Sequence, residues 1–198
     1  MTLQTFTLGT FAQQGVAAGS YESIATVTVG AGGSSSIEFT SIPGTYTHLQ
    51  VRGITQTNRG TYNIDEIWMQ LNSDTGNNYS DHYLFSNTES PSTAVSAGAH
   101  SSYGKITNIA TSSSVATSVF GAAIIDILDY ANTNKYKTIR ALTGVDTNGA
   151  ASGYAGFVSF VSGGWRNTNA ITSIKLYPGI GTTLSQYSSF ALYGIKAA

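Results

Sequence analysis

The sequence predicts an all-β protein, built as one antiparallel β-sandwich that is jelly-roll-like and has about ten strands. Two observations carry this prediction. Short runs of alternating or β-branched and aromatic residues recur along the chain, and turn residues such as Gly, Pro, Asn and Asp separate them. No segment carries a convincing helical pattern, and a length of 198 residues suits one large all-β domain.

The first half begins this pattern with a series of short strands. The turn Ile42-Pro43-Gly44 leads into one of them, in which Leu49 and Val51 share one face of the chain. The other face of that strand is polar, as expected for a strand that is half-buried. The predicted strands are Glu22–Gly30, Ser35–Thr40, Thr47–Ile54, Ile64–Asn72 and Tyr79–Phe85.

The second half is more regular. Ser118–Tyr130 is a long apolar run that predicts a central strand, and Tyr154–Val161 has apolar residues on both faces, which predicts a strand covered on both sides. We expect the last strand to lie near Thr47–Ile54. Asn87–Ser114 carries little pattern and is predicted to be a surface excursion. The remaining predicted strands are Tyr136–Val145, Ile171–Tyr177 and Ser188–Ile195.

Residues 1–20 form a separate N-terminal arm, and the sandwich domain spans residues 21–198. The arm has no ionisable side chain, and Phe6, Leu8 and Phe11 are its apolar anchors. Two interpretations stay open: a tether that docks on a partner or a neighbouring subunit, and a first edge strand followed by a loop.

The composition is typical of a protein whose surface contacts other molecules. Charged residues are 10% of the chain, against about 25% in ordinary globular domains, and 12 Tyr are present. Neutral, tyrosine-rich surfaces lose little free energy when another protein or a sugar covers them. The net charge of -1 and the scattered basic residues argue against nucleic acid, and no apolar run is long enough for a membrane helix. With no cysteine, there is no disulfide or thiolate metal site.

Catalytic and metal-binding patterns are weak. His48, His82 and His100 stand alone in the sequence, and the loop Asn72–Asn78 has only Asp74 as an ionisable residue, too few carboxylates for a calcium loop. Phosphate-loop and nucleophile-elbow motifs are lacking. The sequence therefore predicts no enzyme, no metal and no cofactor.

A glycoside hydrolase remains as the weakest option, because it needs two carboxylates that face one cleft. Asp126 and Asp129 lie on opposite faces of one strand, and the adjacent Asp65 and Glu66 also diverge. A pair contributed by two different strands stays open.

Aromatic residues are the remaining candidates for a site. Trp68, Tyr79 and Trp165 could form a stacking platform for a sugar, or they could pack on the core or on a neighbouring subunit. Their strand positions favour packing.

Several segments together resemble virion structural proteins of tailed bacteriophages, the group that includes capsid decoration proteins and head or tail fibres. The likeness spans about residues 20–196 and leaves out the arm. The segments are Tyr21–Val29, Phe39–Arg52, Leu71–Tyr79, Asp129–Asn132 and Phe190–Ile195.

The resemblance implies a non-enzymatic component of the virion, assembled in the host cytoplasm and bound to capsid, neck or tail proteins. We expect a homotrimer on the capsid or neck surface, anchored by the arm. The alternative is a receptor- or carbohydrate-binding domain of a tail fibre, with a host-surface glycan as its ligand.

Overall fold

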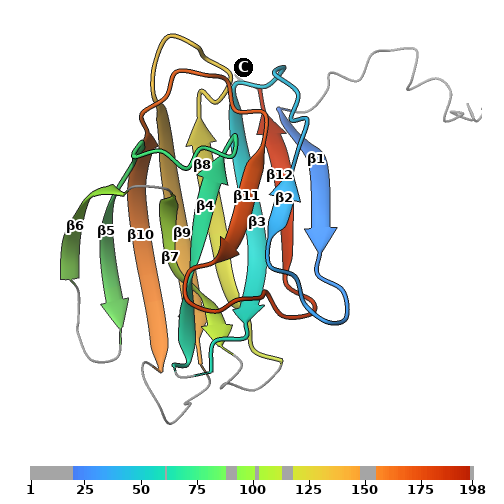
Figure 1. The fold of residues 1–198 in the computed structure, drawn as a ribbon, viewed down its shortest axis with the longest axis vertical. Helices are drawn as coiled ribbons and strands as arrows, with labels where there is room; N and C mark the ends of the chain where they lie inside the picture. Colours follow the sequence, from blue (N-terminus) through green and yellow to red (C-terminus); the bar gives the residue numbers. More distant parts are fainter. Residues whose placement is uncertain are drawn as a thin grey trace, which may run out of the picture.

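The computed structural model of the protein describes residues 20–60, 62–87, 93–100, 103–112, 118–147 and 155–196. Every regular element in these ranges is a strand, and there are twelve of them (Figure 1). The prediction of an all-β sandwich is confirmed. In chain order the strands are β1 (Tyr21–Thr28), β2 (Ile37–Phe39), β3 (His48–Thr57), β4 (Ile64–Leu71), β5 (Tyr79–Asn87), β6 (Thr93–His100), β7 (Gly104–Ser112), β8 (Gly121–Leu128), β9 (Lys137–Asp146), β10 (Gly156–Trp165), β11 (Ile174–Pro178) and β12 (Ser189–Ile195).

Two sheets form the sandwich, with the small sheet in front in Figure 1. The small sheet has the order β2-β11-β4-β7, and the large sheet has the order β1-β12-β3-β8-β9-β10-β5-β6. Within each sheet, all neighbouring strands are antiparallel. A short parallel pairing of β3 with β7, from Gln56 opposite Thr111, joins them at one end.

The connections follow a jelly roll with two insertions. Strands β1, β12, β3 and β8 lie opposite β2, β11, β4 and β7. Successive strands of this set alternate between the sheets except for β4 and β7, which are neighbours in the small sheet, as in an eight-stranded jelly roll. The pairs β5-β6 and β9-β10 are the insertions, and both extend the large sheet beyond β8. The large sheet is therefore much wider than the small one.

The core lies between the inner faces of the two sheets. Strand β3 contributes Leu49 and Val51, whose alternation the sequence predicted, and β12 pairs with β3 from Ser189–Ile54 to Ile195–His48. The expected neighbourhood of these two strands is confirmed. The buried apolar cluster also includes Ile37, Phe39, Ile67, Met69, Leu71, Ile125, Ile127, Phe190 and Leu192.

One predicted loop is wrong. The stretch Asn87–Ser114 contains β6, at the edge of the large sheet, and β7, which pairs with β4 in the small sheet. Thr93–His100 consists of Ala, Ser, Thr, Gly and His with one Val, so its sequence has no apolar alternation. Backbone pairing with β5 defines this strand, and a search for hydrophobic periodicity does not detect that signal.

Candidate functional site

Two of the three candidate aromatic residues lie in the buried core of the domain. Tyr79 and Trp165 are fully buried, and each makes hydrogen bonds within the domain. The Tyr79 hydroxyl lies within 3.0 Å of the Leu71 backbone nitrogen, which donates to it, and burial raises the pKa of Tyr79 to about 12. Neither residue can stack on a sugar or touch a neighbouring subunit.

Trp68 is half-buried on the outer face of the small sheet. Its ring stacks on Tyr103 with a centroid distance of 3.8 Å and an interplanar angle of 5°, and Tyr177 meets it edge-on. The indole nitrogen donates to Glu66 at 2.9 Å. A Cβ atom on Gly179 would lie 2.6 Å from that nitrogen, so the backbone there approaches the ring closely. Tyr103 covers one face of Trp68, which leaves less aromatic surface for a ligand.

The other sequence candidates either lie outside the described residues or form no ligand site. Phe6, Leu8 and Phe11, and the whole arm up to residue 19, lie outside the described residues. His48 accepts a hydrogen bond on Nδ1 from the Asp129 backbone nitrogen at 2.9 Å, and it is four strands away from His82 in the large sheet. No group of three His, Asp or Glu side chains gathers within the part of the chain that the structure describes.

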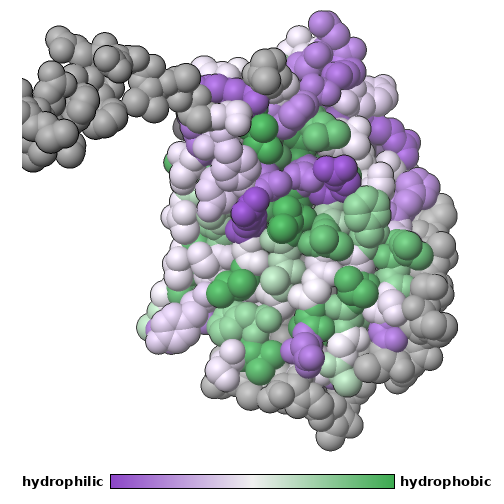
Figure 2. Space-filling model, turned by 180° about the vertical axis from the view of Figure 1, so that it is seen from behind, coloured by the Kyte–Doolittle hydropathy of each residue, from purple (hydrophilic) through white to green (hydrophobic). Residues whose placement is uncertain are grey.

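The outer face of the large sheet is apolar in its middle (Figure 2). The sequence did not predict this surface. Apolar side chains occupy the middle of this face, over β8, β9, β10 and β5. Their exposure in the single chain is 39–53%. Contiguous exposed apolar patches on soluble proteins usually mark an interaction site. These residues are Leu84, Ile124, Leu142, Val158 and Phe160.

The strand register arranges these side chains in straight rows across the strands. Phe160 lies opposite both Leu84 and Leu142, and Leu142 lies opposite Ile124. We call these four residues the large row. Two positions further along each strand lies a parallel row of smaller residues, which we call the small row: Ser86, Val158, Gly144 and Ala122. On β3 the small row ends beside the exposed Ile54, which lies opposite Ala122, and the large row ends beside Arg52, which lies opposite Ile124.

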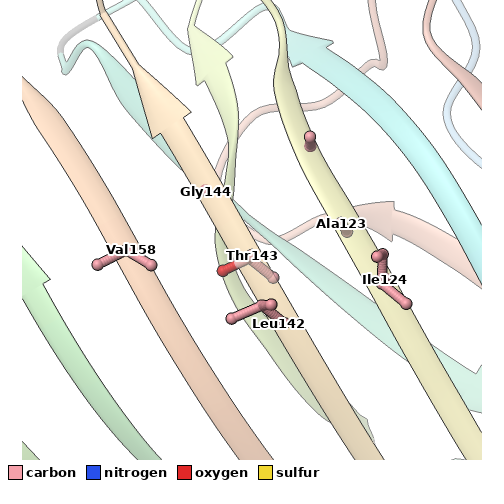
Figure 3. A pocket seen from close by; sticks show the side chains of 7 residues that line it. Ala123, Ile124, Leu142, Thr143, Gly144 and Val158 are labelled. Atoms are coloured by element: carbon pink, nitrogen blue, oxygen red, sulfur yellow. The ribbon is translucent and has the colours of Figure 1, made fainter.

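The difference in size between the two rows leaves hollows above the small row. One hollow, of about 320 Å³, lies over Gly144 and Ala122, and another of about 180 Å³ lies beside Ser86 and Val158. Figure 3 shows Val158, Leu142 and Ile124 on three neighbouring strands around the first hollow. A Cβ atom added to Gly144 would meet no atom within 4 Å. The face is therefore ridged, with one raised row and one lowered row.

A polar network borders the large row on its other side. Arg140 donates to Oδ2 of Asp126 at 2.8 Å, and Gln50 donates to Oδ1 of the same carboxylate at 2.7 Å. Gln50 in turn accepts from Arg52 at 2.6 Å. These residues occupy adjacent strands, so the network runs across β9, β8 and β3.

The network ends in two stacked tyrosines on β1 and β12. The rings of Tyr21 and Tyr193 are 4.9 Å apart, and the Arg52 guanidinium lies over both, at 5.3 and 5.8 Å. Burial is the largest influence on Tyr21 and raises its pKa. Arginine and tyrosine beside an apolar centre are the composition of a protein interface.

Sequence reasoning missed this face although its signal was present. The apolar residues on both sides of Tyr154–Val161 predicted a strand covered on both faces. In the single chain only the inner face is covered, because Val158 and Phe160 on the outer face are 49% and 44% exposed. The excess of apolar residues over what one core needs was the signal for this exposed apolar face.

The comparisons with known proteins give no further indication of identity. No family model matches this chain, and no curated protein or solved structure matches it. In the described ranges no helix is long and apolar enough to cross a membrane.

Proposed function

We propose that this protein is a non-enzymatic structural component of a tailed-phage virion. It is a decoration, fibre or appendage protein on the capsid or neck surface, and the N-terminal arm anchors it to the particle. The observation that carries the proposal is the apolar outer face of the large sheet, since an exposed apolar patch of this kind marks a surface that contacts another molecule.

The makeup of this face supports a contact with protein. Its centre is aliphatic and aromatic, and its margin contains Arg52, Arg140 and two tyrosines. The backbone of paired strands is already ordered, so this face loses little backbone conformational entropy on association. The resemblance to virion structural proteins supplies the assembly in which such a contact would serve.

The test is the composition of purified particles. Virions from a host that carries the gene are compared with virions from a strain in which it is deleted, by mass spectrometry and electron microscopy. We expect the protein in many copies on intact particles and a missing surface feature after deletion. Its absence from washed particles would exclude a virion role.

Two variants refine this test. A chain that lacks residues 1–20 should fold and no longer bind particles that were assembled without the protein. The full chain with Phe160→Glu keeps the arm, so the two variants separate anchoring by the arm from contact by the sheet. Unchanged binding by the truncated chain would exclude the arm as the anchor.

A second candidate function is glycan binding by a tail fibre, and the aromatic cluster of Trp68, Tyr103 and Tyr177 favours it. Glu66 and Lys175 lie beside these rings and offer an acceptor and a donor to a sugar. A glycan array decides this question. Selective binding that is lost in Trp68→Ala would establish host recognition, and an array without signal would exclude it for the sugars displayed.

A further inference from the structure

We propose that the outer face of the large sheet binds a second copy of this chain, face to face, about a two-fold axis that runs between the large row and the small row. This inference rests on the proposed function only in taking the same face as an interface. It adds the partner and the symmetry, and it puts a dimer in place of the homotrimer that the resemblance led us to expect.

The first argument is the shape of the face. The two-fold axis runs across the strands, parallel to the two rows and between them. Rotation about this axis places each strand of the second copy over the same strand of the first copy, in the opposite direction. The large row of one copy then lies on the small row of the other. Leu142 meets Gly144, Ile124 meets Ala122, Phe160 meets Val158 and Leu84 meets Ser86.

This arrangement is self-complementary in size at these four positions, and on β3 it sets Arg52 opposite Ile54 of the second copy. The hollow of about 320 Å³ over Gly144 and Ala122 takes the Leu142 and Ile124 side chains of the second copy. The smaller hollow beside Val158 and Ser86 takes Phe160 and Leu84. Isologous contacts of this kind are the commonest among soluble homo-oligomers.

The second argument is charge. Along the outer side of β9 the order is Arg140, Leu142, Gly144, Asp146. The same axis that sets Leu142 on Gly144 also sets Arg140 opposite Asp146 of the second copy, at both ends of the interface. Arg140 already pairs with Asp126, and its side chain is still 53% exposed. The charges at the two ends of this strand are therefore complementary under the proposed symmetry.

The third argument is area. Strands β3, β8, β9, β10 and β5 span about 24 Å across, and the residues of β9 that this axis superposes, Arg140 to Asp146, span about 20 Å along the strand. The superposed face therefore measures about 480 Å² in projection. A stable interface buries about 800 Å² on each partner, so this face predicts a weak, reversible dimer.

The experiment is a mass measurement of the full chain by sedimentation equilibrium over a range of concentrations. We expect a reversible dimer of twice the 20.7 kDa chain mass. Gly144→Leu fits the single chain but sets a large residue against Leu142 of the other copy, and it should raise the dissociation constant roughly 10- to 100-fold. Ile180→Glu is the matched control, because Ile180 is as exposed as Leu142, at 53%, but lies outside this face.

A size exchange tests the symmetry itself. The double variant Leu142→Ala with Gly144→Leu moves the large residue to the other row, and only the two-fold pairing of these positions restores complementarity. We expect it to recover most of the dimer that Gly144→Leu loses. A monomer at all concentrations, a trimer, or a dimer that neither variant weakens would overturn the proposal. A monomer would leave the face to residues 1–19 or to another protein of the particle.

Discussion

The indole nitrogen of Trp165 donates a hydrogen bond of 2.7 Å to Oδ2 of Asp74 across 91 positions of the chain. This bond ties the end of β10 to the loop between β4 and β5. Asp74 also accepts from the Gly76 backbone nitrogen and from Asn78, each at 2.8 Å, so one carboxylate organises the whole turn. The Asn-rich loop is a structural turn built around Asp74.

Replacing Asp74 with Ala should destabilise the domain by about 2 to 3 kcal/mol. The substitution leaves the buried indole N–H of Trp165 without its acceptor and releases the turn, and hydrogen bonds to charged groups contribute about 1.5 to 3 kcal/mol. Urea unfolding followed by tryptophan fluorescence measures the change. Trp165→Phe is the companion variant, because it removes the donor and keeps an aromatic ring in the core. Wild-type stability in Asp74→Ala would contradict the role of this carboxylate.

Low pH should lower the free energy of unfolding through the same residue, Asp74. Burial alone would raise the pKa of Asp74, but the hydrogen bonds from Asn78, Trp165 and Gly76 outweigh it and hold the pKa below its ordinary value. The Lys135 ammonium holds the pKa of Asp129 down as well. A carboxyl group with a lowered folded pKa contributes stability that is complete above its unfolded value, near 4, and is lost as the pH falls through the folded value.

The free energy of unfolding should therefore decline as the pH falls below about 4. In Asp74→Asn the decline should be shallower, because this side chain no longer titrates. Urea unfolding at a series of pH values between about 5 and 2 measures both curves. Parallel curves for the two proteins would show that Asp74 does not contribute to the acid dependence.

Lys137 is a buried cation that holds three backbone carbonyl groups. Its ammonium group donates to Asn132 at 2.5 Å, to Lys135 at 3.0 Å and to Thr168 at 3.0 Å, which joins the turn before β9 to the loop after β10. Burial is the largest influence on this side chain and lowers its pKa.

Lys137→Met should cost about 2 to 4 kcal/mol, because it fills the space but leaves the three carbonyl groups without a donor. Lys135→Met is the matched control. Its ammonium group pairs with Asp129 at 2.7 Å on the surface, and exposed pairs contribute about 1 kcal/mol or less. Equal losses in the two variants, measured by thermal unfolding, would show that the buried position of Lys137 has no special effect.

The sequence was sufficient for the strands that carry strong alternation. Leu49, Val51 and the run around Ile125 have the period of a half-buried or central strand, and the structure places β3 and β8 side by side in the large sheet. Sequence alone did not predict β6, whose residues have no apolar alternation. Pairing with a neighbouring backbone, not hydrophobic pattern, defines such a strand.

The candidate site was harder to predict because it depends on register. Phe160, Leu142 and Ile124 are far apart in the sequence, and only the pairing of three strands aligns them in one row. Trp165 was chosen for its type, and type alone does not tell a core residue from a surface one. The Asp74 hydrogen bond that explains its burial comes from a loop 91 positions away.

Gly53 supports the pairing of β3 with β12 by having no side chain. Phe190 lies directly over it, and a Cβ atom at position 53 would lie 2.1 Å from the Phe190 ring. Phe190 is fully buried in the core and has no room to move away. Gly53→Ala should therefore destabilise the domain by about 1 to 3 kcal/mol through overpacking, although alanine suits a strand better than glycine does.

Gly30→Ala is the control for this last prediction, because an added Cβ atom there would meet nothing within 4 Å. It should change the free energy of unfolding by less than about 1 kcal/mol. The double variant Gly53→Ala with Phe190→Leu should recover only part of the loss, since the shorter side chain relieves the contact with the ring but not the contact of 2.6 Å with the Ser189 carbonyl oxygen. If Gly53→Ala unfolds at the wild-type urea concentration, Phe190 can shift, and the close packing of β3 against β12 is not a constraint on the fold.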